Sequence, residues 1–243
     1  MASKSGLHSE RNKAHIAEVN IQVLVSDWEG HRLLDSGDGL KLEEIGGVRM
    51  IRSEPKAWWS KSLPAAEWAR AVAEHEEGGR EGRWKLKGNC PKEWETRLGK
   101  LRFQLRFMDN SKQFGVFAEQ SPHWKWVASR PQKLEPRPRL LNLFGYTGAA
   151  SLVAAQAGWH VTHVDASKPA VAWGRRNQEL SGMAQEPIRW IIEDAMTFVK
   201  REVKRGNKYE AIMLDPPAFG RGPTGEFWKV ERDLAQIGRA SCR

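Results

Sequence analysis

Hydrophobic and polar positions change their spacing near residue 139, and this change divides the chain into two parts. Between residues 19 and 128 the apolar residues form short alternating runs separated by glycine and charged turns, which is typical of twisted antiparallel strands. After residue 139, short continuous apolar runs alternate with helical patterns, which predicts parallel strands buried on both faces. We therefore expect a smaller, strand-rich α+β domain followed by an α/β domain.

The α/β part contains four strand candidates, and three of them end in an acidic residue. The candidates span 140–144, 159–165, 188–194 and 209–215, and a helical pattern over 149–157 follows the first of them. This alternation predicts a doubly wound sheet. Such a sheet usually has more strands, so we expect the C-terminal strands of the sheet to be missing from these 243 residues.

The N-terminal part yields three local predictions. A helix is expected over 63–77, because Pro64 suits its first turn and two glycines end it. Residues 78–96 are rich in glycine and charge without a clear period, and are expected to be a connection. Residues 101–108 and 113–118 are expected to pair as a hairpin across a turn at 109–111.

Composition supplies the expected boundaries. A polar tail over 1–18 precedes the N-terminal domain (19–128), and a linker with three prolines (129–138) precedes the α/β domain (139–236). The last residues, 237–243 (IGRASCR), resemble a translated sequencing adapter, so we expect a non-native tail.

Charge and cysteine content narrow the class of protein. The formal net charge is +9, which favours an anionic partner such as nucleic acid, although a merely basic surface fits the same charge. With only Cys90 and Cys242, a disulfide framework or a four-cysteine zinc site is excluded. No stretch has the length and apolarity of a membrane span, and we expect a cytoplasmic protein.

The first strand of the α/β part leads into a candidate ligand cradle. Gly145 and Gly148 break the apolar run of RLLNLFGYTG just before the helical pattern. A strand, a glycine turn and a helix N-terminus together can hold the polar end of a nucleotide-like ligand. Asp165, 20 residues after Gly145, can accept both hydroxyls of a ribose, and Asp194 can accept from an adenine amino group.

Two alternatives remain open for these acidic residues. Either one can instead cap the helix that follows it. Neither one distinguishes NAD from S-adenosylmethionine, although GYTGAA lacks the G-x-G-x-x-G spacing of dinucleotide sites.

A second candidate site follows the fourth strand. Pro216 and Pro217 lack N–H donors and have a fixed φ, so they end the strand in a rigid loop. The Asp215 carboxylate and nearby carbonyls can then accept a substrate amino group, and Phe219 can stack on a flipped or single-stranded base. The alternative is a plain Pro-Pro turn with Phe219 packed in the core.

FGYTG, VDAS at the end of the second strand, Asn177 and DPPAF together resemble class I S-adenosylmethionine-dependent methyltransferases. Within that class they are similar to the bacterial family that methylates bases of large-subunit ribosomal RNA. The resemblance covers 139–236, and GVFAEQ (115–120) resembles the G-x-x-x-D/E-Q segment that precedes the family's catalytic domain. It implies a Rossmann-like, seven-stranded sheet and S-adenosyl-L-methionine as cofactor.

The resemblance also assigns the site residues. It implies that the glycine turn lies beside the methionine end of the cofactor, that Asp165 holds the ribose, and that Gln120 closes over the cofactor. The cofactor-binding residues it implies are Phe144, Gly145, Tyr146, Thr147, Gly148, Asp165, Ala166, Ser167, Asn177, Asp194, Ala195 and Gln120. The residues it implies beside the reacting methyl group are Asp215, Pro216, Pro217 and Phe219.

Two departures from the family pattern refine the expected reaction. Family members that make 5-methylcytosine need a cysteine nucleophile, and neither cysteine lies near Asp215 in the sequence. We therefore expect methyl transfer to a nucleobase nitrogen, which needs only positioning and proton acceptance. The alternatives are methylation of a protein or small molecule, and an NAD-dependent oxidoreductase.

The second departure is that the chain has no clear N-terminal RNA-binding module. Contact with ribosomal RNA would then fall to basic and aromatic residues of the N-terminal part; the alternative is a solvated charged face with buried tryptophans. The candidate residues are Arg80, Arg83, Trp84, Lys85, Lys87 and 123–126. No metal site is expected, because no histidine or cysteine stands at ligand spacing from His123.

Overall fold

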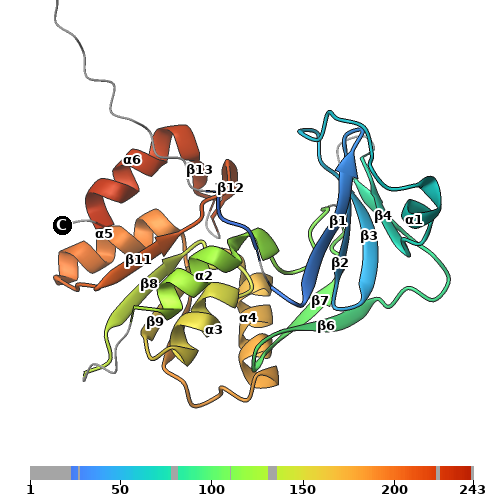
Figure 1. The fold of residues 1–243 in the computed structure, drawn as a ribbon. Helices are drawn as coiled ribbons and strands as arrows, with labels where there is room; N and C mark the ends of the chain where they lie inside the picture. Colours follow the sequence, from blue (N-terminus) through green and yellow to red (C-terminus); the bar gives the residue numbers. More distant parts are fainter. Residues whose placement is uncertain are drawn as a thin grey trace, which may run out of the picture.

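The computed structural model describes residues 23–26, 28–77, 82–109, 111–130, 136–222 and 225–241. In these residues a strand-rich N-terminal part and an α/β part lie side by side (Figure 1). None of the helices in the described residues is long and apolar enough to cross a membrane.

The α/β part is built on a four-stranded parallel sheet. Its strands are β8 (Arg139–Leu143), β9 (His160–Asp165), β10 (Ile188–Ile192) and β11 (Ala211–Leu214). Their order is β10-β9-β8-β11, and every neighbouring pair is parallel. The chain thus moves outward from β8 to β10 and crosses back to β11. The predicted strands and doubly wound topology are confirmed, and the strand order reverses between β8 and β11.

Helices cover both faces of this sheet. They are α3 (Ala149–Gln156), α4 (Lys168–Leu180), α5 (Ala195–Arg205) and α6 (Val230–Ser241). Leu140 of β8 packs in one core cluster with Leu152 of α3, whereas Leu141 and Leu143 pack in another with Phe198 of α5. This alternation is what places α3 and α4 on one face and α5 and α6 on the other (Figure 1).

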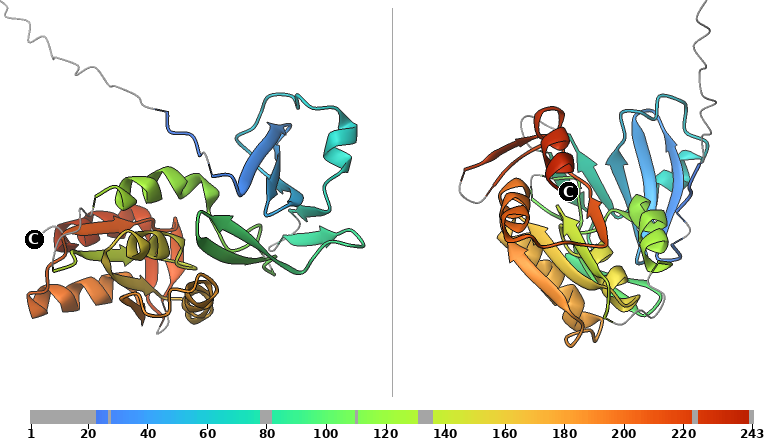
Figure 2. Two further views of the ribbon diagram at one scale, coloured as in Figure 1. Left: turned by 60° about the horizontal axis from the view of Figure 1, so that its bottom comes forward. Right: turned by 90° about the vertical axis from the view of Figure 1, so that its left-hand side faces the viewer.

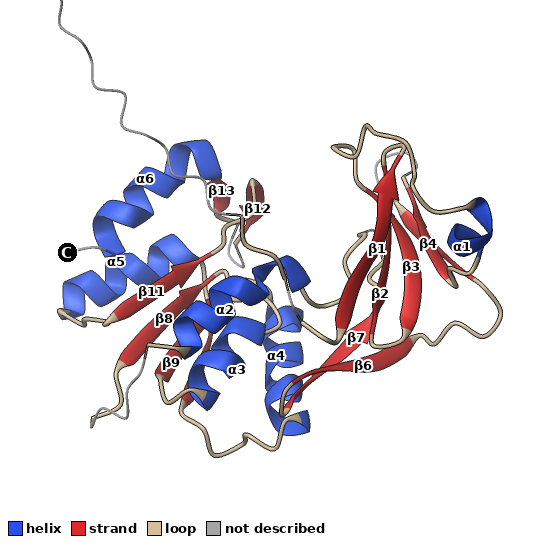
Figure 3. Ribbon diagram, viewed as in Figure 1, coloured by secondary structure: helices blue, strands red, loops and turns tan. Residues whose placement is uncertain are grey.

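A mixed sheet of five strands forms most of the N-terminal part, and Figure 3 labels four of them, β1 to β4. Its strands, in spatial order, are β1 (His31–Gly37), β2 (Leu40–Ile45), β3 (Val48–Ser53), β4 (Ala73–Glu76) and β5 (Arg83–Leu86). Only β3 and β4 pair in parallel. The short helix α1 (Ala65–Ala69) covers one face and buries Trp68 against Leu42 and Ile51.

A hairpin of β6 (Glu93–Leu98) and β7 (Leu101–Arg106) connects the two parts. It lies between the N-terminal sheet and the α/β part in the left view of Figure 2. Phe103 of β7 packs edge-on against Trp28, with ring centroids 6.0 Å apart, and Trp28 packs in turn on Trp124, at 5.9 Å. Trp124 belongs to α2 (Ser121–Ala128), which lies on α3. The hydrophobic core is therefore continuous from the hairpin to the α/β part.

Three local predictions for the N-terminal part are wrong. The helix expected over 63–77 is only α1, and strand β4 follows it, because buried Ala73 and His75 alternate with more exposed neighbours at the period of a strand. The connection expected over 78–96 contains β5 and the start of β6.

The hairpin prediction has the wrong partner. Residues 101–106 pair with 93–98, not with 113–118. A two-residue turn joins the true partners, and its first residue, Gly99, has φ +57°, which suits a tight hairpin. In the expected partner, Gly115 has φ +115° and interrupts the extended run before the 3-10 helix η1 (Ala118–Gln120).

The predicted boundaries stay predictions. The tail over 1–18 lies outside the described residues, as do residues 131–135 of the expected linker. Helix α2 ends at Ala128 and β8 begins at Arg139. The segment expected to be non-native begins within α6, and Ile237 there is fully buried.

Replacing Leu105 of the connecting hairpin by alanine should destabilise the protein. Its side chain is fully buried in the continuous core, so Leu105→Ala removes packed methyl groups and leaves a cavity, at a cost of about 3 kcal/mol in the free energy of unfolding. Leu86→Ala on β5 is the matched control, because Leu86 is 41% exposed and should cost less than about 1 kcal/mol. Urea unfolding measures both. Equal losses for the two variants would contradict the hairpin's place in the core.

Candidate functional site

A cavity of about 920 Å³ lies at the carboxyl ends of β8, β9 and β11, where the strand order reverses. One wall is formed by the loops that follow these strands, and the other by residues 108–127 of the preceding segment. In doubly wound sheets this crevice is the usual place for a ligand. The predicted site residues that line it are Gln120, Phe144, Gly145, Tyr146, Thr147, Asp165, Ala166, Ser167, Asp194, Ala195, Asp215, Pro216 and Pro217. Three others, Gly148, Asn177 and Phe219, do not line it.

The glycine turn has an unusual backbone that its packing explains. Phe144 and Tyr146 adopt φ values of +56° and +52°, which side chains other than glycine rarely take and which occur preferentially at functional sites. A Cβ at Gly145 would lie 2.4 Å from the His163 ring, so only glycine lets the turn rest on that buried residue. Gly148 caps α3 at φ +82°, with no room for a Cβ beside Trp190.

Asp165 holds the glycine turn and also faces the cavity. Its Oδ2 accepts the N–H of Tyr146 at 2.8 Å, and its Oδ1 accepts the N–H of Ser167 at 2.8 Å. Burial raises the pKa of this carboxyl, although both N–H donors oppose the shift. The N-cap of α4 is Ser167, whose hydroxyl accepts from Ala170. The helix-cap alternative for Asp165 is therefore wrong.

For Asp194 the helix-cap alternative is confirmed. Its Oδ1 accepts the N–H of Thr197 at 2.8 Å at the start of α5. The residue also lines the cavity, so its contact with an adenine amino group stays a prediction.

Asn177 lies behind the glycine turn. It is 1% exposed; its Nδ2 donates to the carbonyl oxygen of Thr147 at 3.0 Å, and its Oδ1 accepts the N–H of Gln104 on β7 at 2.9 Å. The Thr147 hydroxyl donates to the carbonyl of Gly115. Asn177 therefore ties the turn to the connecting hairpin, and the structure gives it no contact with the cavity.

Asp215 is the end of a hydrogen-bond chain that Gln120 links to His123 across the cavity. Its Oδ2 accepts from Nε2 of Gln120 at 2.9 Å, and Oε1 of Gln120 accepts from Nδ1 of His123 at 2.6 Å. This direction follows because an amide that donates through Nε2 can only accept through Oε1. Burial and the nearby charge of Glu119 raise the pKa of Asp215, whereas His123 opposes the shift.

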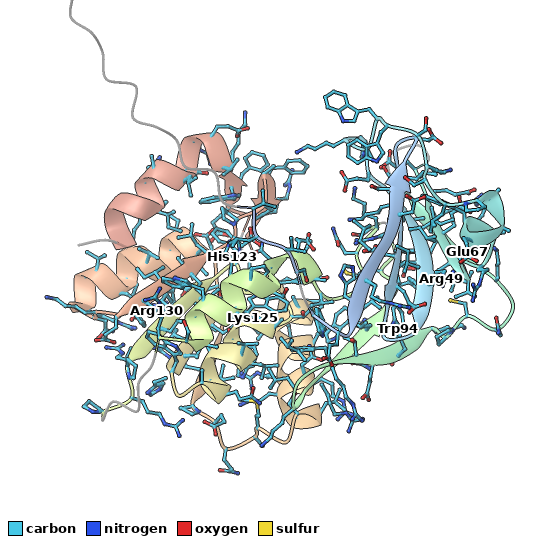
Figure 4. All side chains as sticks on the ribbon, in the orientation of Figure 1. Arg49, Glu67, Trp94, His123, Lys125 and Arg130 are labelled. Carbon is cyan, nitrogen blue, oxygen red and sulfur yellow. The ribbon has the colours of Figure 1, made fainter. Side chains whose placement is uncertain are left out.

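His123 and Gln120 come from one continuous helical turn that begins at η1, and Figure 4 labels His123 on α2. Their pairing is not among the predictions from the sequence. The available signal was their spacing of three residues, which brings side chains together on a helix.

The loop after β11 packs against Trp228, which is not among the site residues predicted from the sequence. Two short strands, β12 (Phe219–Arg221) and β13 (Phe227–Lys229), follow this loop. Trp228 is 5% exposed, donates to the carbonyl of Pro217 at 2.8 Å and packs on Phe144 with ring centroids 4.8 Å apart. Phe219 is 72% exposed, so the alternative that buried it in the core is wrong.

Most of the basic and aromatic residues predicted to contact RNA form contacts within the N-terminal part instead. Arg83 and Lys85 form ion pairs with Glu76, and Trp84 packs on Phe107 at 4.5 Å between ring centroids. Lys87 donates to the carbonyl of Ala69.

The other residues predicted to contact RNA differ in their exposure. Trp124 is buried, whereas Trp126 is 56% exposed, lines the cavity and carries the Arg130 guanidinium 4.4 Å from its ring centroid. Arg80 lies outside the described residues.

The described part of the chain offers no metal or cysteine chemistry at the cavity. It contains no group of three or more histidine, cysteine or acidic residues that could hold a metal ion. Cys90 does not line the cavity, and burial raises the pKa of its thiol, which lowers its nucleophilicity at neutral pH.

Comparisons with known proteins agree on one family. A sequence model described as S-adenosylmethionine-dependent methyltransferase matches residues 56–239. The crystal structure of the SAM-dependent methyltransferase from Agrobacterium tumefaciens is 43% identical, with a TM-score of 0.87 over 93% of this chain and 73% of that chain. The structure of SMU.776 complexed with SAH (S-adenosylhomocysteine) is 18% identical, covers 87% of this chain and 58% of that chain, and shares the fold at a TM-score of 0.66.

A curated relative, the ribosomal RNA large subunit methyltransferase K/L of Hahella chejuensis, is 36% identical over 125 residues. That match covers 51% of this chain and 16% of the relative's length. The family match spans well over half of the chain and contains the glycine turn, both acidic strand ends and the DPPAF loop. The chain therefore belongs to the S-adenosylmethionine-dependent methyltransferase family.

Proposed function

We propose that this protein transfers the methyl group of S-adenosylmethionine to a nucleobase nitrogen of ribosomal RNA. One observation carries the proposal: a single cavity joins the glycine turn and Asp165 on one side to the Asp215-Pro216-Pro217 loop on the other. The first group suits a nucleoside and the second suits an amino-like acceptor.

The residues around the cavity fit the cofactor of the family. Each carboxylate oxygen of Asp165 accepts one backbone N–H and retains a further lone pair for a ribose hydroxyl. Asp194 and Ala195 would lie near the adenine, and the turn over 144–148 near the methionine end. The bound cofactor supplies an electrophilic methyl group on a sulfonium centre.

On the acceptor side, Asp215 can hold the nitrogen in line with the methyl group. Its carboxylate accepts an amino N–H of the base, and the proline pair fixes the direction of approach, because neither residue can adjust its φ. Once the nitrogen gains the methyl group it must lose a proton. Burial and Glu119 raise the pKa of Asp215, which makes its carboxylate a better proton acceptor than an ordinary aspartate. Gln120 now occupies one oxygen of this carboxylate and must share or release it.

Several observations favour a nitrogen of RNA over the alternatives. No cysteine lines the cavity in the described residues, so these residues offer no nucleophile for the covalent route to a ring carbon. The exposed Phe219 next to the acceptor loop favours a planar base over a peptide or a small metabolite. The Hahella chejuensis relative is named for methylation of large-subunit ribosomal RNA.

A calorimetric titration with S-adenosylhomocysteine tests the first half of the proposal. We expect binding in the micromolar range and no binding of NAD in a parallel titration. A folded protein that binds neither ligand would overturn the assignment of the cavity. Transfer of a labelled methyl group to deproteinised ribosomal RNA, followed by nucleoside analysis, tests the second half; label on protein alone would support the protein-substrate alternative.

Replacing Asp165 by alanine should weaken binding of S-adenosylhomocysteine. The change removes the charged acceptor of the ribose hydroxyls, at a cost on the order of 2–3 kcal/mol in binding free energy. It also removes the partner of the Tyr146 and Ser167 N–H groups, which hold the turn in shape. Asp165→Asn keeps one acceptor oxygen and should lose less. An affinity equal to that of the wild type in the same titration would show that Asp165 does not hold the ribose.

Replacing Glu119 by glutamine should shift the acid limb of the pH–rate profile. Asp215 acts as an acceptor only when ionised, and Glu119 is one of two causes that raise its pKa. The variant therefore lowers the pKa of Asp215, and half-maximal activity on the acid side should occur at a lower pH. Glu93→Gln on β6 is the control and should leave the profile unchanged, because Glu93 neither lines the cavity nor contributes to the pKa shift of Asp215. A limb that stays in place in Glu119→Gln would show that another group sets it.

A further inference from the structure

The hairpin of β12 and β13 has two chemically different faces. In its register Phe219 lies opposite Lys229, Gly220 opposite Trp228, and Arg221 opposite Phe227. Opposed residues of an antiparallel pair share a face, and successive pairs alternate between faces. Trp228 points inward and is buried, so the other two pairs share the outward face.

The outward face alternates aromatic rings with cations. Phe219 and Phe227 are 72% and 50% exposed, and Arg221 and Lys229 are also exposed. In each directly opposed pair, one member is aromatic and the other is cationic. Within the described residues neither cation forms an ion pair, and neither pair contains an acid. Large exposed aromatics that no other element covers are costly to leave in water, and a cluster of them commonly marks a binding surface.

This face is continuous with the mouth of the cavity. Arg221 lines the cavity, as does Trp126 of α2. Trp126 is exposed and stacked with Arg130, so it repeats the aromatic and cationic pairing from a second element. Figure 4 labels His123 on α2 and Arg130 just beyond the C-terminal end of α2, with His123 nearer the hairpin. A chain whose reacting base reaches Asp215 would therefore meet these rings and charges as it leaves the cavity.

We propose that the outward face of β12–β13 is the platform that holds the single-stranded RNA segment next to the target base. Bases stack on Phe219 and Phe227, and the phosphates between them contact Arg221 and Lys229. A single strand suits this face, because its bases are free to stack and its phosphates recur beside each base. A duplex keeps its bases stacked within the helix and offers no ring to the phenylalanines. This inference rests on the proposed nucleobase acceptor. It adds where the RNA binds and that the bound segment is single-stranded.

The test uses the full chain and a fluorescently labelled single-stranded RNA of twelve nucleotides of mixed sequence. Fluorescence anisotropy gives its affinity over a series of sodium chloride concentrations. The double variant Arg221→Ala/Lys229→Ala should lower the magnitude of the slope of log affinity against log salt by about 1.4, because each lost phosphate contact on a single strand removes about 0.7. Phe227→Ala should weaken binding about tenfold with little change in slope.

The chain supplies a matched control in Arg83→Ala/Lys85→Ala. These cations lie on an exposed strand but are paired with Glu76, so their loss should leave the slope unchanged. Titration of Phe227→Ala with S-adenosylhomocysteine checks folding, and this variant should bind as the wild type does.

Three outcomes would overturn the platform. The first is equal affinity of the wild type for the single strand and for the same sequence as a duplex. The second is an unchanged slope in the Arg221/Lys229 variant. The third is equally tight binding of poly-glutamate that does not depend on Phe227, which would favour an acidic peptide.

The methylation assay separates this inference from the proposed function. Methylated RNA together with an unchanged slope in the Arg221/Lys229 variant would remove the platform alone. Single-strand binding through Phe227 without any methylated base would support the platform and remove the proposed acceptor.

Discussion

The buried amide of Asn177 holds the glycine turn to the connecting hairpin. One side of this amide binds the Thr147 carbonyl of the glycine turn, and the other binds the Gln104 amide of the connecting hairpin. Thr147 in turn donates to Gly115, just before the segment that carries Gln120. A buried amide that satisfies two backbone groups is costly to displace, because both would be left without partners. The place of Gln120 opposite Asp215 therefore depends on a residue that never faces the cavity.

This arrangement explains which parts of the site the sequence could predict. The glycine turn, Asp165 and the DPPAF loop stand directly at the ends of apolar strands, so the period of the sequence places them at one edge of a sheet. Their mutual position then follows from the parallel topology. Asn177 carries no such signal, since a polar residue within a helix pattern gives no indication of whether it meets a ligand or another part of the backbone.

The N-terminal part was less predictable for a physical reason. Strand β7 has a clear alternating pattern, but an alternating pattern does not specify its partner. The true partner, β6, is rich in charge because one of its faces is in water, so its pattern is weak. Residues 113–118 are largely apolar because Phe114, Val116 and Ala118 are buried in the continuous core. Residues buried by tertiary contacts and residues buried in a strand pair give the same apolar pattern in the sequence. Likewise, the helix predicted to start near Pro64 ends after five residues. Residues 73–76 are more stable paired with β3 and β5 as strand β4 than they would be as an extension of α1.

The two sides of the cavity differ in how far packing fixes their residues. The cofactor side is built from backbone groups and one carboxylate in a rigid turn, and rigid backbone suits a ligand that is the same in every turnover. The acceptor side relies on side chains that reach solvent, with Asp215 shared with Gln120 and Phe219 free on its hairpin. Such groups tolerate exchange without loss of the fold, because few packing contacts depend on them. Under the proposed function, the residues around β12–β13 and α2 can therefore change with the acceptor while the cofactor side of the cavity is kept.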